Sequence, residues 1–137
     1  MTFDRENRSA PEALVVAAAV IEQDGSFLLT RRLAGTHMAG CWEFPGGKCE
    51  AGETHAAALA RELDEELGVT VDVGPLVVSV AHTYPERRVE LHFYRTRLLG
   101  TPRPQLGQEM RWVPRGELRG LDLPEADAAL IDLLAFE

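Results

Sequence analysis

The stretch GKCEAGETHAAALARELDEELGV, residues 47–69, restricts the fold of this chain more than any other part of its sequence. Thr54 is a residue type that caps helix N-termini, and Gly68 is one that ends helices. Leucines recur every fourth residue between them, at Leu59, Leu63 and Leu67. This spacing predicts a short amphipathic helix that buries its leucine stripe and is entered through a glycine-containing loop.

Glu62, Glu65 and Glu66 fall on one side of the predicted helix, because successive residues turn by about 100°. Like charges at these spacings each cost a helix about 0.2–0.5 kcal/mol, and its only cation is Arg61. Carboxylates are hard oxygen ligands that suit Mg²⁺ or Mn²⁺ better than zinc. The cluster therefore favours a bound divalent cation over the alternative, a solvated charged face.

The same segment resembles the Nudix box, G-x5-E-x7-R-E-U-x-E-E-x-G-U with U an aliphatic residue, at every fixed position. The matching residues are Gly47, Glu53, Arg61, Glu62, Leu63, Glu65, Glu66, Gly68 and Val69. The resemblance implies a Nudix-type α/β/α sandwich with a mixed β-sheet. It also implies Mg²⁺-dependent hydrolysis of a diphosphate linkage, with Mn²⁺ as a possible substitute.

By this resemblance the cation ligands are Glu62, Glu65, Glu66 and the backbone carbonyl of Gly46, and Glu62 is also a candidate general base. Arg61 and Glu53 complete the implied catalytic set: Arg61 supports the loop through an ion pair with Glu53. The alternative for these two residues is an ordinary surface pair, which contributes less than about 1 kcal/mol.

Outside the box, WEFPGGK (residues 42–48), TRRLAGTHMA (30–39) and YPERR resemble the MutT-like branch of the family. This likeness implies a nucleotide site. Its residues would be Arg32, His37, Glu43, Phe44, Pro45, Gly46, Arg87 and Asp127. The alternatives are that Arg32 ends a strand in solvent, that His37 caps a loop, and that Phe44 and Tyr84 belong to the core.

Two departures from the branch concern specificity and metal binding. Asp127 stands where MutT-like proteins often have an asparagine. A carboxylate accepts hydrogen bonds, which suits the N1 and N2 hydrogens of guanine or the N4 amine of cytosine; alternatively, Asp127 caps the last helix. The family commonly has a glutamate where this chain has Leu106, and nearby Glu109 is a candidate replacement.

The function predicted from the resemblance is that of a nucleoside triphosphate pyrophosphohydrolase that releases the monophosphate and pyrophosphate. Its substrate would be 8-oxo-dGTP, which would make the protein a nucleotide-pool sanitising enzyme. One alternative keeps the reaction and changes the substrate to CTP, dCTP or 5-methyl-dCTP. An alternative from another class is a non-catalytic nucleotide-sensing module.

The 137 residues fit one domain, predicted as a loose arm over residues 1–12 and a Nudix hydrolase domain over 13–137. The net charge of −8 argues against a nucleic-acid polymer or an anionic membrane as a partner. Two cysteines without CxxC spacing predict free thiols, and the N-terminal residues do not have the pattern of a secretory signal. We expect a cytoplasmic monomer or homodimer.

The hydrophobic pattern predicts the remaining elements. The apolar run of residues 13–21 favours a buried strand that forms a hairpin with residues 26–31. A brief strand in CWEFPGG would end at the Pro-Gly-Gly break. Further strands are expected at residues 69–81, 89–98 and 110–113, with YPERR as a turn, and a final helix at 124–136. Such an order predicts an α/β sandwich.

Overall fold

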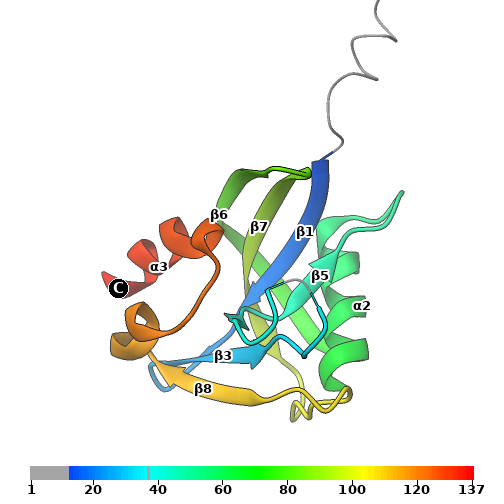
Figure 1. Cartoon of the computed structure of the whole chain (residues 1–137). Coiled ribbons are helices and arrows are strands. Elements are labelled where there is room, and N and C mark those ends of the chain that lie inside the picture. Colours follow the sequence, from blue (N-terminus) through cyan, green and yellow to red (C-terminus); the bar gives the residue numbers. More distant parts are fainter. Residues whose placement is uncertain (1–12, 37) are drawn as a thin grey trace, which may run out of the picture.

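A computed structural model describes residues 13–36 and 38–137 (Figure 1). Its strands are β1 (Ala13–Val20), β2 (Glu22–Gln23), β3 (Ser26–Arg31), β4 (Trp42–Glu43), β5 (Gly46–Lys48), β6 (Val71–Tyr84), β7 (Arg87–Leu98) and β8 (Met110–Pro114). Its helices are α2 (His55–Leu67), α3 (Ala128–Ala135) and the 3-10 helices η1 (Arg115–Gly120) and η2 (Glu125–Asp127). The predicted arm, residues 1–12, and His37 lie outside the described residues.

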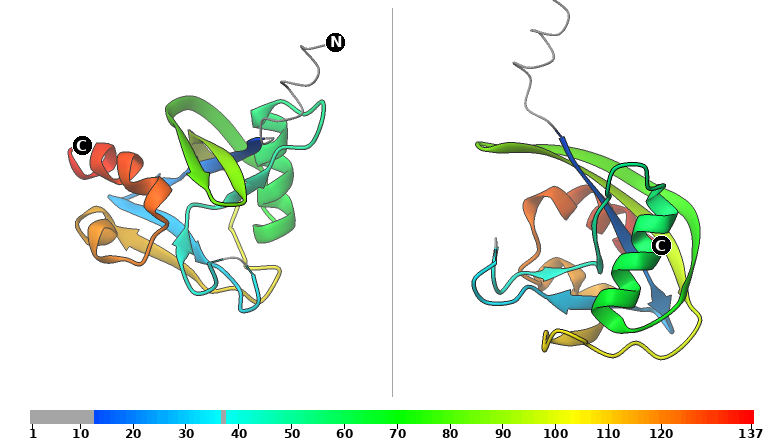
Figure 2. Two further views of the ribbon diagram at one scale, coloured as in Figure 1. Left: turned by 45° about the horizontal axis from the view of Figure 1, so that its top comes forward. Right: turned by 90° about the vertical axis from the view of Figure 1, so that its right-hand side faces the viewer.

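Two sheets form the middle of the molecule. One has the order β5-β1-β7-β6, with β1 and β7 parallel and the other neighbours antiparallel. In the other, β3 pairs with β2, β4 and β8. The helices α2 and α3 lie on opposite sides of these sheets (Figures 1 and 2). This arrangement confirms the predicted α/β/α sandwich with a mixed sheet. Within the described ranges, no helix is long and apolar enough to span a membrane.

Strand β1 is covered on both faces, which explains why its sequence is apolar throughout. Ala17, Ala19 and Ile21 belong to the core cluster that contains the buried leucines of α2. Ala18 and Val20 belong to the cluster on the side of α3. Alternate residues of a strand point to opposite faces, so a strand between two helical layers must be apolar at every position. The predicted buried strand is confirmed.

Helix α2 begins and ends as predicted. The Thr54 side-chain oxygen accepts a hydrogen bond from the backbone N–H of Ala57 at 3.1 Å. At the other end, Gly68 adopts the left-handed conformation, with φ of 58°, and its N–H donates to the carbonyl of Asp64. Only glycine enters this region at little cost, so the residue marks the helix end. Between the two caps, Leu59, Leu63 and Leu67 are fully buried.

The predicted hairpin between residues 13–21 and 26–31 is wrong. Both edges of β1 are occupied, by β5 and by β7, so β3 cannot pair with it. The chain does turn at Asp24 and Gly25, which both have positive φ, but the strand that returns alongside β3 is the short β2. The apolar pattern indicated burial on both faces of β1, and burial of the faces does not determine which strands occupy the edges.

Three predicted boundaries also shift. Strands β6 and β7 continue through YPERR, where Tyr84 pairs with Arg87 across the turn. The chain after Pro45 forms β5 instead of a simple break. The last helix starts at Ala128, after the 3-10 turn of η2. Each shift brings residues of the predicted nucleotide site onto regular elements that face one cavity.

Candidate active site

The carboxylate of Glu66 is the most perturbed acidic group in the described part of the chain. Its Oε2 atom is buried and accepts no hydrogen bond from the described residues. Desolvation, and after it the nearby carboxylates of Glu43, Glu62 and Glu65, raise its pKa to about 9. A buried carboxylate surrounded by like charges is stabilised either by a proton or by a cation.

Arg61 organises the loop before α2. Its Nε and Nη2 donate to the two oxygens of Glu53 at 2.8 and 2.9 Å, and Nη2 also donates to the carbonyl of Lys48 at 3.0 Å. These hydrogen bonds lower the pKa of Glu53 to about 2, helped by the backbone N–H of Glu50. The predicted ion pair between Arg61 and Glu53 is therefore confirmed, and its forked geometry joins the loop to the helix.

Arg61 also pairs with two of the three glutamates of α2. Its Nη1 lies 2.9 Å from Glu62 Oε1 and 3.6 Å from Glu65 Oε1. No three His, Cys, Asp or Glu side chains of residues 13–36 and 38–137 are grouped so that they could hold a metal ion as they stand. Among the buried side-chain atoms of the described residues, Glu66 Oε2 and Thr30 Oγ1 are the two polar atoms without a hydrogen-bond partner. The donor chemistry fits a hard cation at Glu66, and the metal-ligand roles of the set stay predictions.

Gly46 and Gly47 bring β5 close to both β1 and α2. A Cβ atom on Gly46 would lie 2.1 Å from the carbonyl oxygen of Ala17, so only glycine fits there. A Cβ atom on Gly47 would lie 2.4 Å from the carboxyl carbon of Glu62. The two glycines therefore allow the backbone to pass directly beside a box carboxylate. The carbonyl of Pro45 is already used, because it accepts a hydrogen bond from Ala19 at 2.7 Å.

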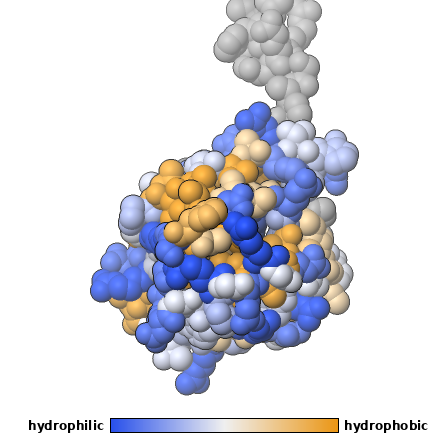
Figure 3. Space-filling view, turned by 90° about the vertical axis from the view of Figure 1, so that its left-hand side faces the viewer, coloured by the Kyte–Doolittle hydropathy of each residue, from blue (hydrophilic) through white to orange (hydrophobic). Residues whose placement is uncertain are grey.

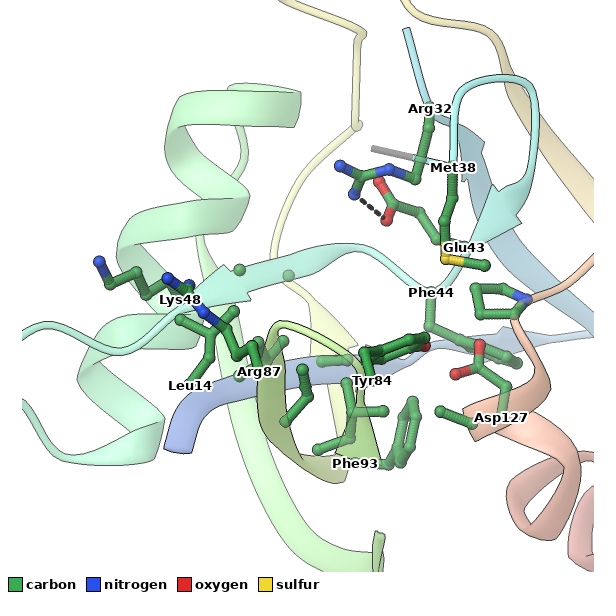
Figure 4. Close-up of a pocket in the computed structure, with 18 of the residues that line it drawn as sticks. Leu14, Arg32, Met38, Glu43, Phe44, Lys48, Tyr84, Arg87, Phe93 and Asp127 are labelled. Carbon is green, nitrogen blue, oxygen red and sulfur yellow. Dashed lines mark hydrogen bonds and ion pairs between the residues drawn. The ribbon is translucent and has the colours of Figure 1, made fainter. Parts of the chain in front are cut away.

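A cavity of about 510 Å³ is lined on one side by the residues of β5 (Figure 4). Its walls come from β1, β7, the turn between β6 and β7, the segment before β5, and η2. Its lining residues include Arg32, Glu43, Phe44, Gly46, Lys48, Tyr84, Arg87, Phe93 and Asp127. The volume suits a nucleoside-sized ligand. The cavity thus brings together all of the predicted nucleotide-site residues except Pro45 and His37, and His37 lies outside the described residues.

The two ends of this cavity differ in charge. Arg87 and Lys48 lie at one end and Asp127 lies at the other, with Tyr84 between them (Figure 4). Apolar side chains also gather on the face of the molecule on the α3 side, where charged groups interrupt them (Figure 3). Phe44 is buried and packs edge-on against Phe93 at 5.9 Å, so it belongs to the core and lines the cavity at once.

Asp127 is 5% exposed and makes no capping hydrogen bond with the start of α3. Asp127 therefore stands at the N-cap position of α3, as the alternative expected, but its side chain does not cap the helix. Burial, and after it the charge of Glu43, raise its pKa to about 7. The carboxyl group lines the cavity, where it is available to a polar ligand edge.

Arg32 and Glu43 form an ion pair of 2.9 Å at the wall of the cavity (Figure 4). Burial raises the pKa of Glu43, although the Arg32 guanidinium acts in the opposite direction. The alternative of an arginine that ends its strand in solvent is wrong. Glu109 does not line this cavity; it pairs with Arg31 at 3.0 Å.

Three residues that line the cavity or lie next to Glu66 were not predicted from the sequence. Lys48 lines the basic end of the cavity, and it could have been suspected because it directly follows the two glycines. Thr30 and Gln108 are buried polar residues next to Glu66. No motif marks them, because only the packing of β3 and of the loop before β8 brings them to α2.

Comparison with known proteins identifies the family. Residues 16–133 match the model of the NUDIX domain. The chain is 40% identical to the 8-oxo-dGTP diphosphatase of Haemophilus influenzae over 124 residues, which cover 89% of this chain and 91% of that protein. It is 39% identical to the CTP pyrophosphohydrolase of Escherichia coli over 118 residues, which cover 85% and 87% of the two chains.

Solved structures agree with the sequence comparison. The solution structure of the Escherichia coli ORF135 protein is similar with a TM-score of 0.76 and 38% identity, covering 93% of this chain and 91% of that one. The crystal structure of the MutT protein from Methanosarcina mazei gives a TM-score of 0.81 and 26% identity, with 90% and 94% covered. Sequence, fold and box geometry agree, and the chain belongs to the Nudix family.

Proposed function

We propose that this chain is a Mg²⁺-dependent nucleoside triphosphate pyrophosphohydrolase that releases a nucleoside monophosphate and pyrophosphate. The observation that carries the proposal is the unpaired, buried Oε2 of Glu66, which lies among three further carboxylates. The nucleoside-sized cavity is lined by Gly46 and Gly47 of β5, and Gly47 also lies against the carboxylate of Glu62. The names of the relatives from Haemophilus influenzae and Escherichia coli support the same reaction.

In this proposal Glu62, Glu65, Glu66 and the carbonyl of Gly46 would hold Mg²⁺, or Mn²⁺ in its place. When bound, the cation neutralises charge on the phosphoryl oxygens and acidifies a water molecule. Glu62 would accept a proton from the attacking water when it is not used as a ligand.

Arg61 positions the glutamates of the Nudix box, because it joins the loop that carries Glu53 to the helix that carries Glu62. Arg87 and Lys48 lie at the basic end of the cavity, where a triphosphate would be attracted. Such local positive charge is needed in a chain with a net charge of −8.

Two substrate bases fit the acidic end of the cavity. Our first choice is 8-oxo-dGTP, supported by several relatives that carry the name 8-oxo-dGTP diphosphatase. The second is CTP, dCTP or 5-methyl-dCTP, supported by the CTP pyrophosphohydrolase relative. Asp127 is buried and can hydrogen-bond either base edge. We also propose a cytoplasmic setting, supported by the two free cysteines, Cys41 and Cys49.

A nucleotide panel tests reaction and base preference together. With Mg²⁺ present, we expect monophosphate and pyrophosphate as products and the highest kcat/KM for 8-oxo-dGTP. The measurement is product analysis of 8-oxo-dGTP, dGTP, CTP, dCTP and 5-methyl-dCTP at low substrate concentration. A clear preference for dCTP would select the second substrate class, and release of orthophosphate would contradict the proposed reaction.

The variant Gly47→Ala tests whether Glu62 must lie against β5. The added Cβ displaces the Glu62 carboxylate, which is the flexible end of a side chain, so we expect a folded protein. Activity should fall at least about tenfold, since small displacements of reacting groups are costly. Gly116→Ala is the matched control, because a Cβ atom there meets no atom within 4 Å. Equal activity of the two variants would argue against a catalytic position for Glu62.

A further inference from the structure

The segment of residues 99–109, between β7 and β8, closes the C-terminal turn of α2 (Figure 1). The last carbonyls of a helix have no partner within it. Here the N–H of Arg103 donates to the Leu67 carbonyl at 2.8 Å, and the N–H of Gln105 donates to the Glu66 carbonyl at 2.9 Å. The main chain of the segment therefore already gives both carbonyls a partner.

Gln108 adds a side-chain bridge at the same place. Its Nε2 donates to the Glu66 carbonyl at 3.0 Å, and its Oε1 accepts a hydrogen bond from the N–H of Leu106 at 2.9 Å. These partners allow the amide only one orientation, because a carbonyl accepts and an N–H donates. Gln108 is 8% exposed, whereas the neighbouring residues of the segment are exposed. The buried amide therefore links the segment to Glu66 in one defined geometry.

The sheet that contains β8 anchors this bridge. The carbonyl of Glu109 accepts a hydrogen bond from the N–H of Arg31 at 3.0 Å, which continues the pairing of β3 and β8 by one residue. Gln108 directly precedes this pair, so its backbone position is set by the sheet. The other donors to the end of α2 come from exposed residues farther along the segment. Of these contacts, the Gln108 amide is the one that fixes Glu66 relative to the sheet.

Glu66 is a residue at which such a link affects the cation site. To bind a cation, its carboxyl group must be ionised beside Glu43, Glu62 and Glu65, whose charges already raise its pKa. Like charges then drive the carboxylate away from them. Helix ends fray, so the main chain at Glu66 would move with its side chain. The Gln108 amide opposes this movement and carries no charge of its own.

We propose that Gln108 is a positioning residue for Glu66. Its amide holds the last turn of α2 in place relative to β8, so that the Glu66 carboxylate is already oriented for the divalent cation. This inference rests on the proposed function, because it concerns the same cation. It adds a residue outside the Nudix box to the support of that site.

Gln108→Met tests the proposal, because methionine has a similar length and cannot donate a hydrogen bond to Glu66. Mn²⁺ binding to the nucleotide-free full chain is measured by electron paramagnetic resonance. We expect Gln108→Met to weaken binding about fivefold, the size of one net hydrogen bond. The Mg²⁺ concentration for half-maximal activity should rise by the same factor. At saturating Mg²⁺, kcat should stay within about twofold of wild type, since the lost contact affects binding and not the chemical step.

Gln105→Met is the matched control. Gln105 lies in the same segment, is exposed, and its side chain donates to the Arg103 carbonyl within the segment. Its hydrogen bond to Glu66 comes from the main chain, so the substitution retains it. We expect this variant to bind Mn²⁺ as the wild type does.

Thermal unfolding checks that each variant is folded. If Gln108→Met does not fold, Gln108→Asn and Gln105→Asn make the same comparison, because asparagine is one methylene too short to reach both partners of Gln108. Equal Mn²⁺ binding by the variant at Gln108 and its control would overturn the role of Gln108 while leaving the proposed function intact. A wild-type chain that binds no Mn²⁺ would overturn both.

Discussion

Replacement of Glu66 by glutamine is expected to reduce Mg²⁺-dependent pyrophosphate release at least about a thousandfold. A cation supplies several kcal/mol to a phosphoryl-transfer transition state, and each factor of ten in rate corresponds to about 1.4 kcal/mol. The amide keeps the size of the side chain and loses the charge that binds the cation. The measurement is kcat/KM for the best nucleotide of the panel, over a range of Mg²⁺ concentrations.

Asp64→Asn is the matched control for Glu66→Gln. Asp64 is an exposed carboxylate on the same helix, two residues away, and it has no proposed role in the site. We expect this variant to retain wild-type activity. If Glu66→Gln also retains it, Glu66 is not a ligand of the catalytic cation.

The stability of the metal-free protein gives an independent readout at the same residue. Glu66 has a folded-state pKa of about 9, against an ordinary value of 4.5. Between these values the folded chain holds a proton that the unfolded chain has released, so the free energy of unfolding falls as the pH rises. The loss is complete above about pH 9. Thermal unfolding at several pH values should show a weaker decline in Glu66→Gln.

Features that depend on local sequence were predictable. The caps at Thr54 and Gly68, the buried leucines and the Arg61–Glu53 pair all lie within one short segment, where residue type and spacing determine the contacts. The α/β/α sandwich followed from the order of the elements together with the family resemblance.

Features that depend on pairing between distant segments were not predictable in the same way. An apolar run indicates a buried strand and leaves its neighbours unspecified, so the hairpin prediction for β1 failed. The same holds for Glu109, whose partner Arg31 is distant in sequence, and for Thr30, which becomes part of the site through its ladder partners. Asp127 stands at the N-cap position of α3, but its side chain is buried and makes no capping hydrogen bond.

Base preference is expected to depend on pH through Asp127. Its pKa of about 7 means that the carboxyl group is largely neutral below this pH and ionised above it. The ionised group accepts two hydrogen bonds, which suits the N1 and N2 hydrogens of guanine. The neutral group donates one and accepts one, which suits N3 and the N4 amine of cytosine. The ratio of kcat/KM for 8-oxo-dGTP over dCTP should therefore rise as the pH increases through about 7.

Asp127→Asn and Asp127→Ala separate charge from hydrogen bonding at this position. Asparagine donates and accepts at every pH, so the ratio should become independent of pH. Alanine removes the contact, and we expect kcat/KM to fall about 10- to 100-fold, as one bidentate base contact contributes about 1–3 kcal/mol. The exposed Glu125 of the same 3-10 helix provides the matched control, Glu125→Gln, which should leave the ratio unchanged.

The ratio is the informative quantity because pH effects on the shared chemical step, including those at Glu66, cancel between two substrates of one enzyme. The same pKa predicts an effect on stability: between 3.8 and about 7 the free energy of unfolding falls as the pH rises, since the folded chain keeps the Asp127 proton. Asp127→Asn should remove this decline as well. A ratio that varies with pH equally in wild type and Asp127→Asn would show that another group selects the base.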